Sequence, residues 1–149
     1  MLFRSETLPP PEPIVFPGES VRVAVVGAHL SGLPLNHQLT ERGGRLEKAG
    51  RTSAHYRLYA LPGTTPPKPG MVRDIERGSA IELEVWRMPA SEYGSFVAAI
   101  PSPLGIGQVE LENGEWVQGF VCEGWAVQGA EEISQLGGWR AFLAQKAAH

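Results

Sequence analysis

A chain of 149 residues with a formal charge of −3 has room for one domain with its own core, but it offers no basic field to nucleic acid or to an anionic membrane. Its single cysteine, Cys122, excludes an internal disulfide and a zinc site built from several cysteines. No apolar run approaches the roughly 20 residues that a membrane span requires. The composition therefore predicts a soluble, cytoplasmic protein.

The first twenty residues have the composition of a linker. Residues 8–20, LPPPEPIVFPGES, contain five prolines and one glycine, which favour an extended chain. We expect residues 1–20 to be a tether of the kind that follows a preceding domain, and residues 21–149 to form the folded domain. A protein that has lost its neighbour and a fragment cut at the joint would both have this sequence.

Residues 21–38, VRVAVVGAHLSGLPLNHQ, are expected to carry the functional site. Their β-branched run ends abruptly at Gly27, as a buried strand does when it enters a turn. The turn, residues 27–32, is bounded by glycines and contains His29 and a serine, and Pro34 then begins a short helix. A strand, a glycine-bounded loop and a helix in this order often present backbone N–H groups to a small anion.

Periodicity and turn residues predict the remaining elements. Residues 40–54 are polar and interrupted by glycine, which indicates a loop with some exposed strand. Strands are expected at 56–61, 71–75, 80–86, 108–111 and 116–122, and helices at 89–99 and 137–147. The strands at 71–75 and 80–86 are expected to form a hairpin, and the last two strands form another around Asn113-Gly114.

These elements predict the α+β class. About six strands, joined mostly as hairpins, and three helices favour a mixed or antiparallel sheet that curls into a small β-barrel, with helices inserted. A Rossmann fold does not fit, because the loop at 27–32 lacks G-x-G-x-x-G and no second βα unit with a suitably placed acidic residue follows.

Seven sequence strings, in order along the chain, resemble one protein family. They are VVGAHLSGLPLNHQL, YRLYALPG, PPKPG, IELEVW, IPSPLGIG, GFVCE and GGWRAFL, and they run from about residue 21 to residue 143. Together they are similar to the C-terminal domain of allophanate hydrolase, which belongs to the γ-glutamylcyclotransferase-like superfamily. In that family an amidase domain precedes the small domain, and this chain contains no amidase half.

The resemblance implies a function in urea and allophanate breakdown. In allophanate hydrolase the amidase half leaves N-carboxycarbamate, and the C-terminal domain is thought to promote loss of carbon dioxide from it. Decarboxylation at nitrogen needs a place for the anionic substrate and a proton for the nitrogen. We expect the backbone N–H groups of residues 27–32 to supply the first and His29, which can titrate near neutral pH, to supply the second.

A cavity is therefore expected at the end of the strand at 21–26, with His29 as the catalytic proton donor. The substrate-binding residues predicted around it are Gly27, Ala28, Leu30, Ser31, Gly32, Asn36, Tyr59 and Glu84. Structural roles are open for several of them, since the serine can cap a helix and the tyrosine can pack in the sheet. No metal and no cofactor is expected, because neither a His-x-x-His pair nor a Ser-His-Asp spacing occurs.

Two other functions stay open. The chain could be a non-catalytic accessory domain that binds and stabilises a separate amidase, with a homodimer as a further option. It could also be a cyclotransferase, although the glutamate of the usual L-D-x-x-E-G motif is missing from residues 99–105, AIPSPLG. That activity would have to use Glu82 or Glu84 instead.

Overall fold

The computed structural model describes residues 18–148. The predicted linker, residues 1–20, lies outside the described residues except for its last three, and Ser20 already belongs to the first strand. No helix in the described part of the chain is both long enough and apolar enough to cross a membrane.

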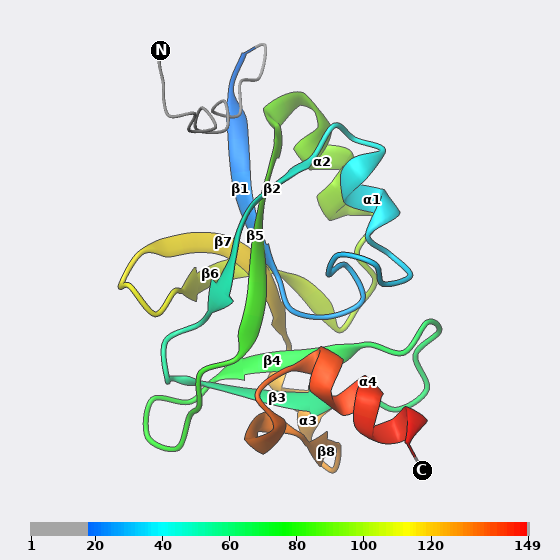
Figure 1. The fold of residues 1–149 in the computed structure, drawn as a ribbon, viewed down its shortest axis with the longest axis vertical. Helices are drawn as coiled ribbons and strands as arrows, with labels where there is room; N and C mark the ends of the chain where they lie inside the picture. The colour runs from blue at the N-terminus through cyan, green and yellow to red at the C-terminus, as the bar shows by residue number, and fades with distance from the viewer. Residues whose placement is uncertain (1–17, 149) are drawn as a thin grey trace, which may run out of the picture.

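Two sheets form the framework of the molecule (Figure 1). The larger sheet has the strand order β2-β5-β1-β7-β6, and the smaller has the order β4-β3-β8. The five strands of the larger sheet are β1 (Ser20–Val25), β2 (Arg45–Arg51), β5 (Glu82–Pro89), β6 (Leu104–Glu110) and β7 (Trp116–Cys122). The smaller sheet contains β3 (Tyr56–Ala60), β4 (Pro69–Arg73) and β8 (Glu131–Glu132).

The predicted α+β class with a mixed sheet is confirmed, but the sheet does not close into a barrel. Strand β1 pairs antiparallel with β5 and parallel with β7, while β2 and β6 remain at opposite edges. Among residues 18–148, a single bridge between Thr52 and Leu111 links the segments that follow these two edge strands. After β2 the chain leaves the larger sheet to form β3 and β4 of the smaller one, and the edge strands β2 and β6 do not pair with each other.

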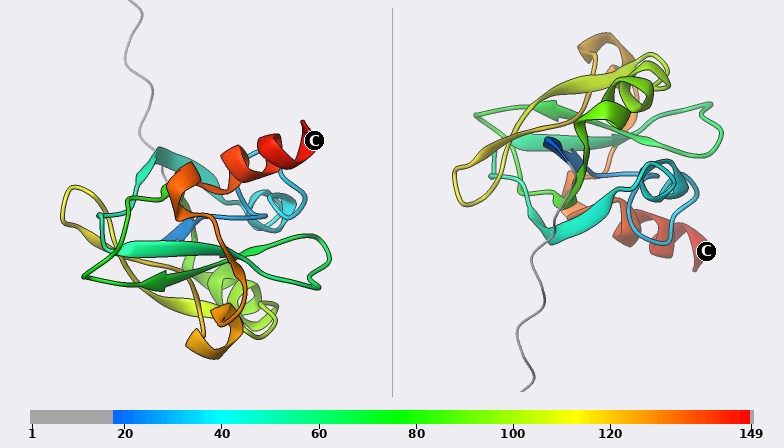
Figure 2. Two further views of the ribbon diagram at one scale, coloured as in Figure 1. Left: turned by 90° about the horizontal axis from the view of Figure 1, so that it is seen from below. Right: turned by 90° about the horizontal axis from the view of Figure 1, so that it is seen from above.

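Short helices connect the strands and cover their ends. They are α1 (His37–Thr40), α2 (Ala90–Ala98), α3 (Gly124–Val127), the 3-10 turn η1 (Ser134–Leu136) and α4 (Trp139–Ala147). In Figures 1 and 2, α1 and α2 lie on one side of the molecule, and the loop between β3 and β4 projects toward that same side. Helix α4 lies at the end of the molecule that holds the smaller sheet (Figure 1).

The hydrophobic core joins the two sheets. Val23 and Val25 of β1 and Leu83 of β5 are buried together with Leu58 of β3 and Met71 of β4. Each such side chain stabilises the fold by about 1.5–3 kcal/mol relative to an exposed position. Strand β1 therefore lies at the centre of the core, and the loop that follows it starts from a rigid support.

One sequence-based expectation about strand pairing is wrong. Residues 71–75 and 80–86 do not form a hairpin, because β4 pairs with β3 while β5 pairs with β1 and β2. The turn between them, in which Asp74 accepts the backbone N–H groups of Glu76 and Arg77, carries the chain from one sheet to the other. Residues 40–54, expected to be a loop with some exposed strand, contain the partly exposed, seven-residue edge strand β2.

Candidate functional site

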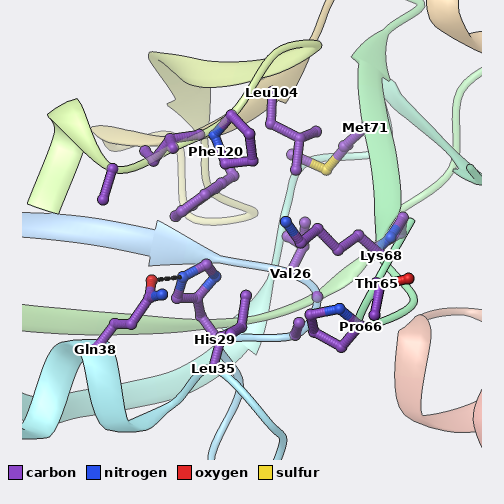
Figure 3. A pocket seen from close by; sticks show the side chains of 16 residues that line it. Val26, His29, Leu35, Gln38, Thr65, Pro66, Lys68, Met71, Leu104 and Phe120 are labelled. Carbon is purple, nitrogen blue, oxygen red and sulfur yellow. Dashed lines mark hydrogen bonds between the residues drawn. The ribbon is translucent and has the colours of Figure 1, made fainter.

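A cavity of about 210 Å³ opens where β1 ends (Figure 3). One side is formed by residues 26–29 together with Leu35 and Gln38, which flank the start of α1. The other side is formed by Thr65, Pro66, Lys68, Pro69, Met71, Ala99, Ile100, Pro101, Leu104 and Phe120. The cavity therefore lies where the sequence predicts it, at the end of the first strand, and both sheets contribute to its walls.

His29 lines this cavity and is only 7% exposed. Its ring packs against Phe120 and Phe96, with centroid distances of 4.7 and 5.5 Å. Its Nε2 lies 2.8 Å from Gln38 Oε1 (Figure 3). Because an amide oxygen only accepts hydrogen bonds, Nε2 carries the proton of the neutral ring and Nδ1 is left with a free lone pair.

The environment of His29 favours the neutral imidazole. Burial lowers its pKa below the usual value of 6.5, and the positive charge of Lys68 lowers it further, against the opposing effect of the bond to Gln38. The free protein therefore holds an uncharged histidine at neutral pH. An anion bound beside the ring would favour its protonation.

The backbone at the cavity floor has unpaired donors. In the described part of the chain, no protein acceptor bonds the N–H groups of Gly27, Ala28 and His29, although all three residues are buried. Buried N–H groups without a partner are rare, and successive free N–H groups in a turn form a concavity that suits an anion. The N–H of Leu30 is not available, because it bonds Gly27 O at 3.0 Å.

Lys68 is a cavity residue that the sequence reasoning missed. Figure 3 shows its side chain extending across the cavity, from the β3–β4 loop into the space between His29 and Met71. No side-chain hydrogen bond or ion pair to its ammonium occurs within residues 18–148, and no carboxylate is among the residues that line the cavity. The signal in the sequence was a lone lysine between prolines, in PPKPG, which by itself indicates only a rigid loop.

The predicted site residues separate into two groups. Gly27, Ala28 and His29 line the cavity. Leu30 is fully buried in the core, and Gly32 occupies an exposed turn position with φ of 80° that favours glycine.

The other four predicted residues lie outside the cavity lining. Asn36 donates from Nδ2 to the carbonyl of His29 at 2.8 Å, and Ser31 bonds Glu84. Tyr59 pairs with Glu132 of β8 in the smaller sheet, so neither Tyr59 nor the Glu82–Trp86 strand forms a wall of the cavity. Tyr59 and Glu84 therefore do not lie around the cavity as expected, because Tyr59 belongs to the smaller sheet and Glu84 bonds Ser31; residues of the β3–β4 loop line the cavity instead.

Glu84 is a buried carboxylate, only 5% exposed, on the strand that pairs with β1. Burial opposes its ionisation, but hydrogen bonds from Trp86 and Ser31 and the charge of Arg140 outweigh this and hold its pKa below the usual value. The carboxylate is therefore ionised at neutral pH and bonded entirely within the protein.

Fold and cavity together define an α+β domain with one buried histidine and one lysine facing a small, mostly apolar space. The family model of the allophanate hydrolase C-terminal domain matches residues 21–144. The chain therefore belongs to the family of allophanate hydrolase C-terminal domains.

Similar proteins differ greatly in length. Urea amidolyase from Lachancea kluyveri is 47% identical over 135 residues, which cover 88% of this chain but only 7% of that protein. Allophanate hydrolase from Kluyveromyces lactis matches with a TM-score of 0.82 and 45% identity, covering 85% of this chain and 21% of that one. A protein described as specific to uropathogenic E. coli matches with a TM-score of 0.79 and 33% identity, covering 85% of this chain and 98% of that one.

Proposed function

We propose that the cavity binds a small N-carboxy dianion and promotes its decarboxylation. N-carboxycarbamate is the proposed substrate, in keeping with the family. The observation that carries the proposal is the combination of one lysine, one neutral histidine and unpaired backbone N–H groups in a space without a carboxylate. The names of the related proteins, urea amidolyase and allophanate hydrolase, support the same class of substrate.

Binding of the anion is assigned to Lys68 and to the backbone N–H groups of Ala28 and His29. The free ammonium on one side of the cavity and the free N–H groups on the other can each donate hydrogen bonds to one end of a molecule with two carboxylates. The predicted role of the whole loop at 27–32 is thereby narrowed, because the N–H groups of Leu30 and Ser31 are already bonded.

Proton transfer is assigned to His29. The incoming dianion favours the imidazolium, whose Nε2–H remains bonded to Gln38 and whose Nδ1–H becomes the donor. The bond between nitrogen and one carboxyl carbon breaks, and its electron pair stays on the nitrogen. That nitrogen takes the proton from Nδ1, so that carbamate and carbon dioxide are formed, and His29 regains a proton from solvent.

The apolar wall favours the loss of carbon dioxide. Phe120, Leu104 and Met71 line the cavity and offer no hydrogen bond to a carboxylate. A carboxylate placed against these side chains loses favourable hydration, whereas neutral carbon dioxide is weakly hydrated. The apolar wall therefore destabilises the carboxylate more than the carbon dioxide that it becomes. The same lack of carboxylates in the lining speaks against cyclotransferase chemistry, since Glu82 and Glu84 do not line the cavity.

The proposal is tested by following carbon dioxide release from enzymatically generated N-carboxycarbamate, with the spontaneous rate subtracted. His29→Ala and His29→Asn should each slow release by about 10²-fold, the range expected for one general acid. Both should still bind malonate, with only the contribution of the imidazolium lost, because Lys68 and the backbone N–H groups are unchanged. Lys68→Met should weaken malonate binding by about 10- to 100-fold, as expected for loss of a charged hydrogen bond.

Matched controls are available on the surface. His37, whose side chain is 61% exposed, and Lys48, 40% exposed, are the same residue types outside the cavity, so His37→Asn and Lys48→Met should behave as wild type. If wild-type protein does not raise the rate above the protein-free control, the accessory-domain function replaces the catalytic one. If the His29 variants match wild type above that control, His29 is not the proton donor.

A further inference from the structure

Ser31, two residues after His29, is held by two charged side chains from other parts of the chain. Its backbone N–H and its hydroxyl donate to Glu84 Oε1, at 2.8 and 3.0 Å. Its carbonyl oxygen accepts from Arg140 Nη2 at 2.7 Å. Every polar group of this residue is therefore fixed from the side of the loop away from the cavity lining.

Arg140 also neutralises the carboxylate that holds Ser31. Its Nη2 lies 3.2 Å from Glu84 Oε2, and its Nη1 lies 3.3 Å from Glu82 Oε2. The fourth donor to Glu84 is the uncharged Nε1–H of Trp86, at 3.0 Å. Among the described residues, Arg140 is thus the cation that pairs with this buried negative charge.

Helix α4 brings Arg140 into place through contacts with β5. The backbone N–H of Glu82 donates to Gly137 O at 2.8 Å. At Gly138, which precedes the helix, a Cβ atom would lie 2.7 Å from Glu82 Cβ, so the chain passes β5 too closely for any side chain there. The start of α4 is therefore fixed against the strand that carries Glu84.

We propose that Arg140 is a positioning residue for the anion site, holding Ser31 by its carbonyl and cancelling the charge of Glu84 behind the loop. The front of the same loop presents the free N–H groups of Ala28 and His29. An unpaired carboxylate behind it would repel an anion through a poorly solvated interior, where charges are weakly screened. This inference rests on the proposed function in that the ligand is an anion.

The test combines malonate binding by calorimetry with the titration of His29 by NMR. The His29 resonance is assigned among the four histidines by its loss in a His29→Gln variant. Arg140→Gln should bind malonate roughly 10-fold more weakly, by analogy with the roughly 10- to 100-fold effect of removing residues that orient metal ligands. It should also raise the pKa of His29, because the uncompensated carboxylate favours the imidazolium.

Two further variants separate charge from folding. The double variant Glu84→Gln with Arg140→Gln removes both charges, so malonate affinity should return to within about 3-fold of wild type, and the His29 titration should return with it. Arg57→Gln is the matched control, because Arg57 pairs with two carboxylates, Glu132 and Asp74, outside the cavity lining. It should change neither measurement.

The outcomes distinguish this inference from the proposed function. A folded Arg140→Gln variant with wild-type malonate affinity and wild-type His29 titration overturns the inference, as does an equal loss in Arg57→Gln. A wild-type chain that binds malonate but does not accelerate carbon dioxide release overturns the proposed function alone. A wild-type chain that binds no malonate overturns the anion site and both proposals with it.

Discussion

Substituting Gly27 by alanine tests whether the site loop depends on its close approach to β4. A Cβ atom at this position would lie 2.5 Å from Pro69 Cδ and 2.7 Å from Pro69 Cγ. Carbon atoms at ordinary contact are separated by about 3.5–4.0 Å, so the loop and the start of β4 must move apart by roughly 1 Å. Neither side yields easily, because the proline ring is rigid and Gly27 directly follows the central strand.

The size of the effect follows from this overlap. Overpacking of a close contact costs about 1–3 kcal/mol, which for a chain of this length lowers Tm by roughly 3–10 °C. The free N–H groups of Ala28 and His29 follow Gly27 directly and move with it. A displacement near 1 Å at groups that position a substrate can cost up to about 10²-fold in rate, so we expect carbon dioxide release to slow by about 10- to 100-fold.

The assay pairs thermal unfolding with carbon dioxide release, and Gly94→Ala serves as the control. Gly94 lies within α2 and has no atom within 4 Å of its would-be Cβ, so alanine there should stabilise the chain by about 0.5–1 kcal/mol with activity unchanged. A Gly27→Ala variant with the Tm and activity of wild type would refute the reasoning, since it would show that Pro69 moves aside without disturbing the loop.

Three further predictions concern buried polar groups and the ring of His29. Thr52→Val should destabilise the chain by about 1–3 kcal/mol in urea unfolding, because the fully buried Thr52 Oγ1 accepts the N–H of Ile81 at 2.9 Å and valine leaves that donor unpaired. The pKa of His29 is lower in the folded chain than in the unfolded chain, so the unfolded chain takes up the proton at a higher pH. The free energy of unfolding should therefore fall as the pH drops below about 6.5. The His29→Gln variant should lose this part of the pH dependence. A urea midpoint difference between wild type and His29→Gln that is the same at pH 7.5 and pH 5.5 would contradict the second prediction. Phe120→Ala should cost about 3–5 kcal/mol and, by admitting water to the ring of His29, should raise the pKa of His29 in an NMR titration.

Local chemistry made part of the fold predictable. The run of valines predicts β1, and Gly27 at its end predicts the loop that follows. Both features lie within a few residues of each other, so local sequence is enough to recognise them. The Asn113-Gly114 pair likewise marks the β6–β7 hairpin, in which Gly114 has φ of 92°. The bounds of strand β2 were not predictable within the expected loop and exposed strand at 40–54, because it is an edge strand rich in arginine and lysine, with much of its length exposed.

The far side of the cavity was not predictable from local pattern. Lys68 comes from a proline-rich loop that carries no periodicity, and it meets His29 because β4 packs close to the end of β1. The alternation along β5 puts Glu82 and Glu84 on the same face of the strand, but it does not show which of the two is buried or which feature it faces. Glu84 is the buried one, and it bonds Ser31 and Arg140 behind the loop, since α4 supplies Arg140 from 56 residues away.

The division of the cavity between two sides has an evolutionary consequence. The hydrogen bonds that hold His29 and Ser31 come from Gln38, Asn36, Glu84 and Arg140, and in the described part of the chain none comes from residues 65–68. The orientation of His29 therefore does not depend on hydrogen bonds from the enclosing side. Substitutions at 65–68 can change the width and charge of the opening while the histidine keeps its orientation, which gives lineages of this domain a route to other small ligands.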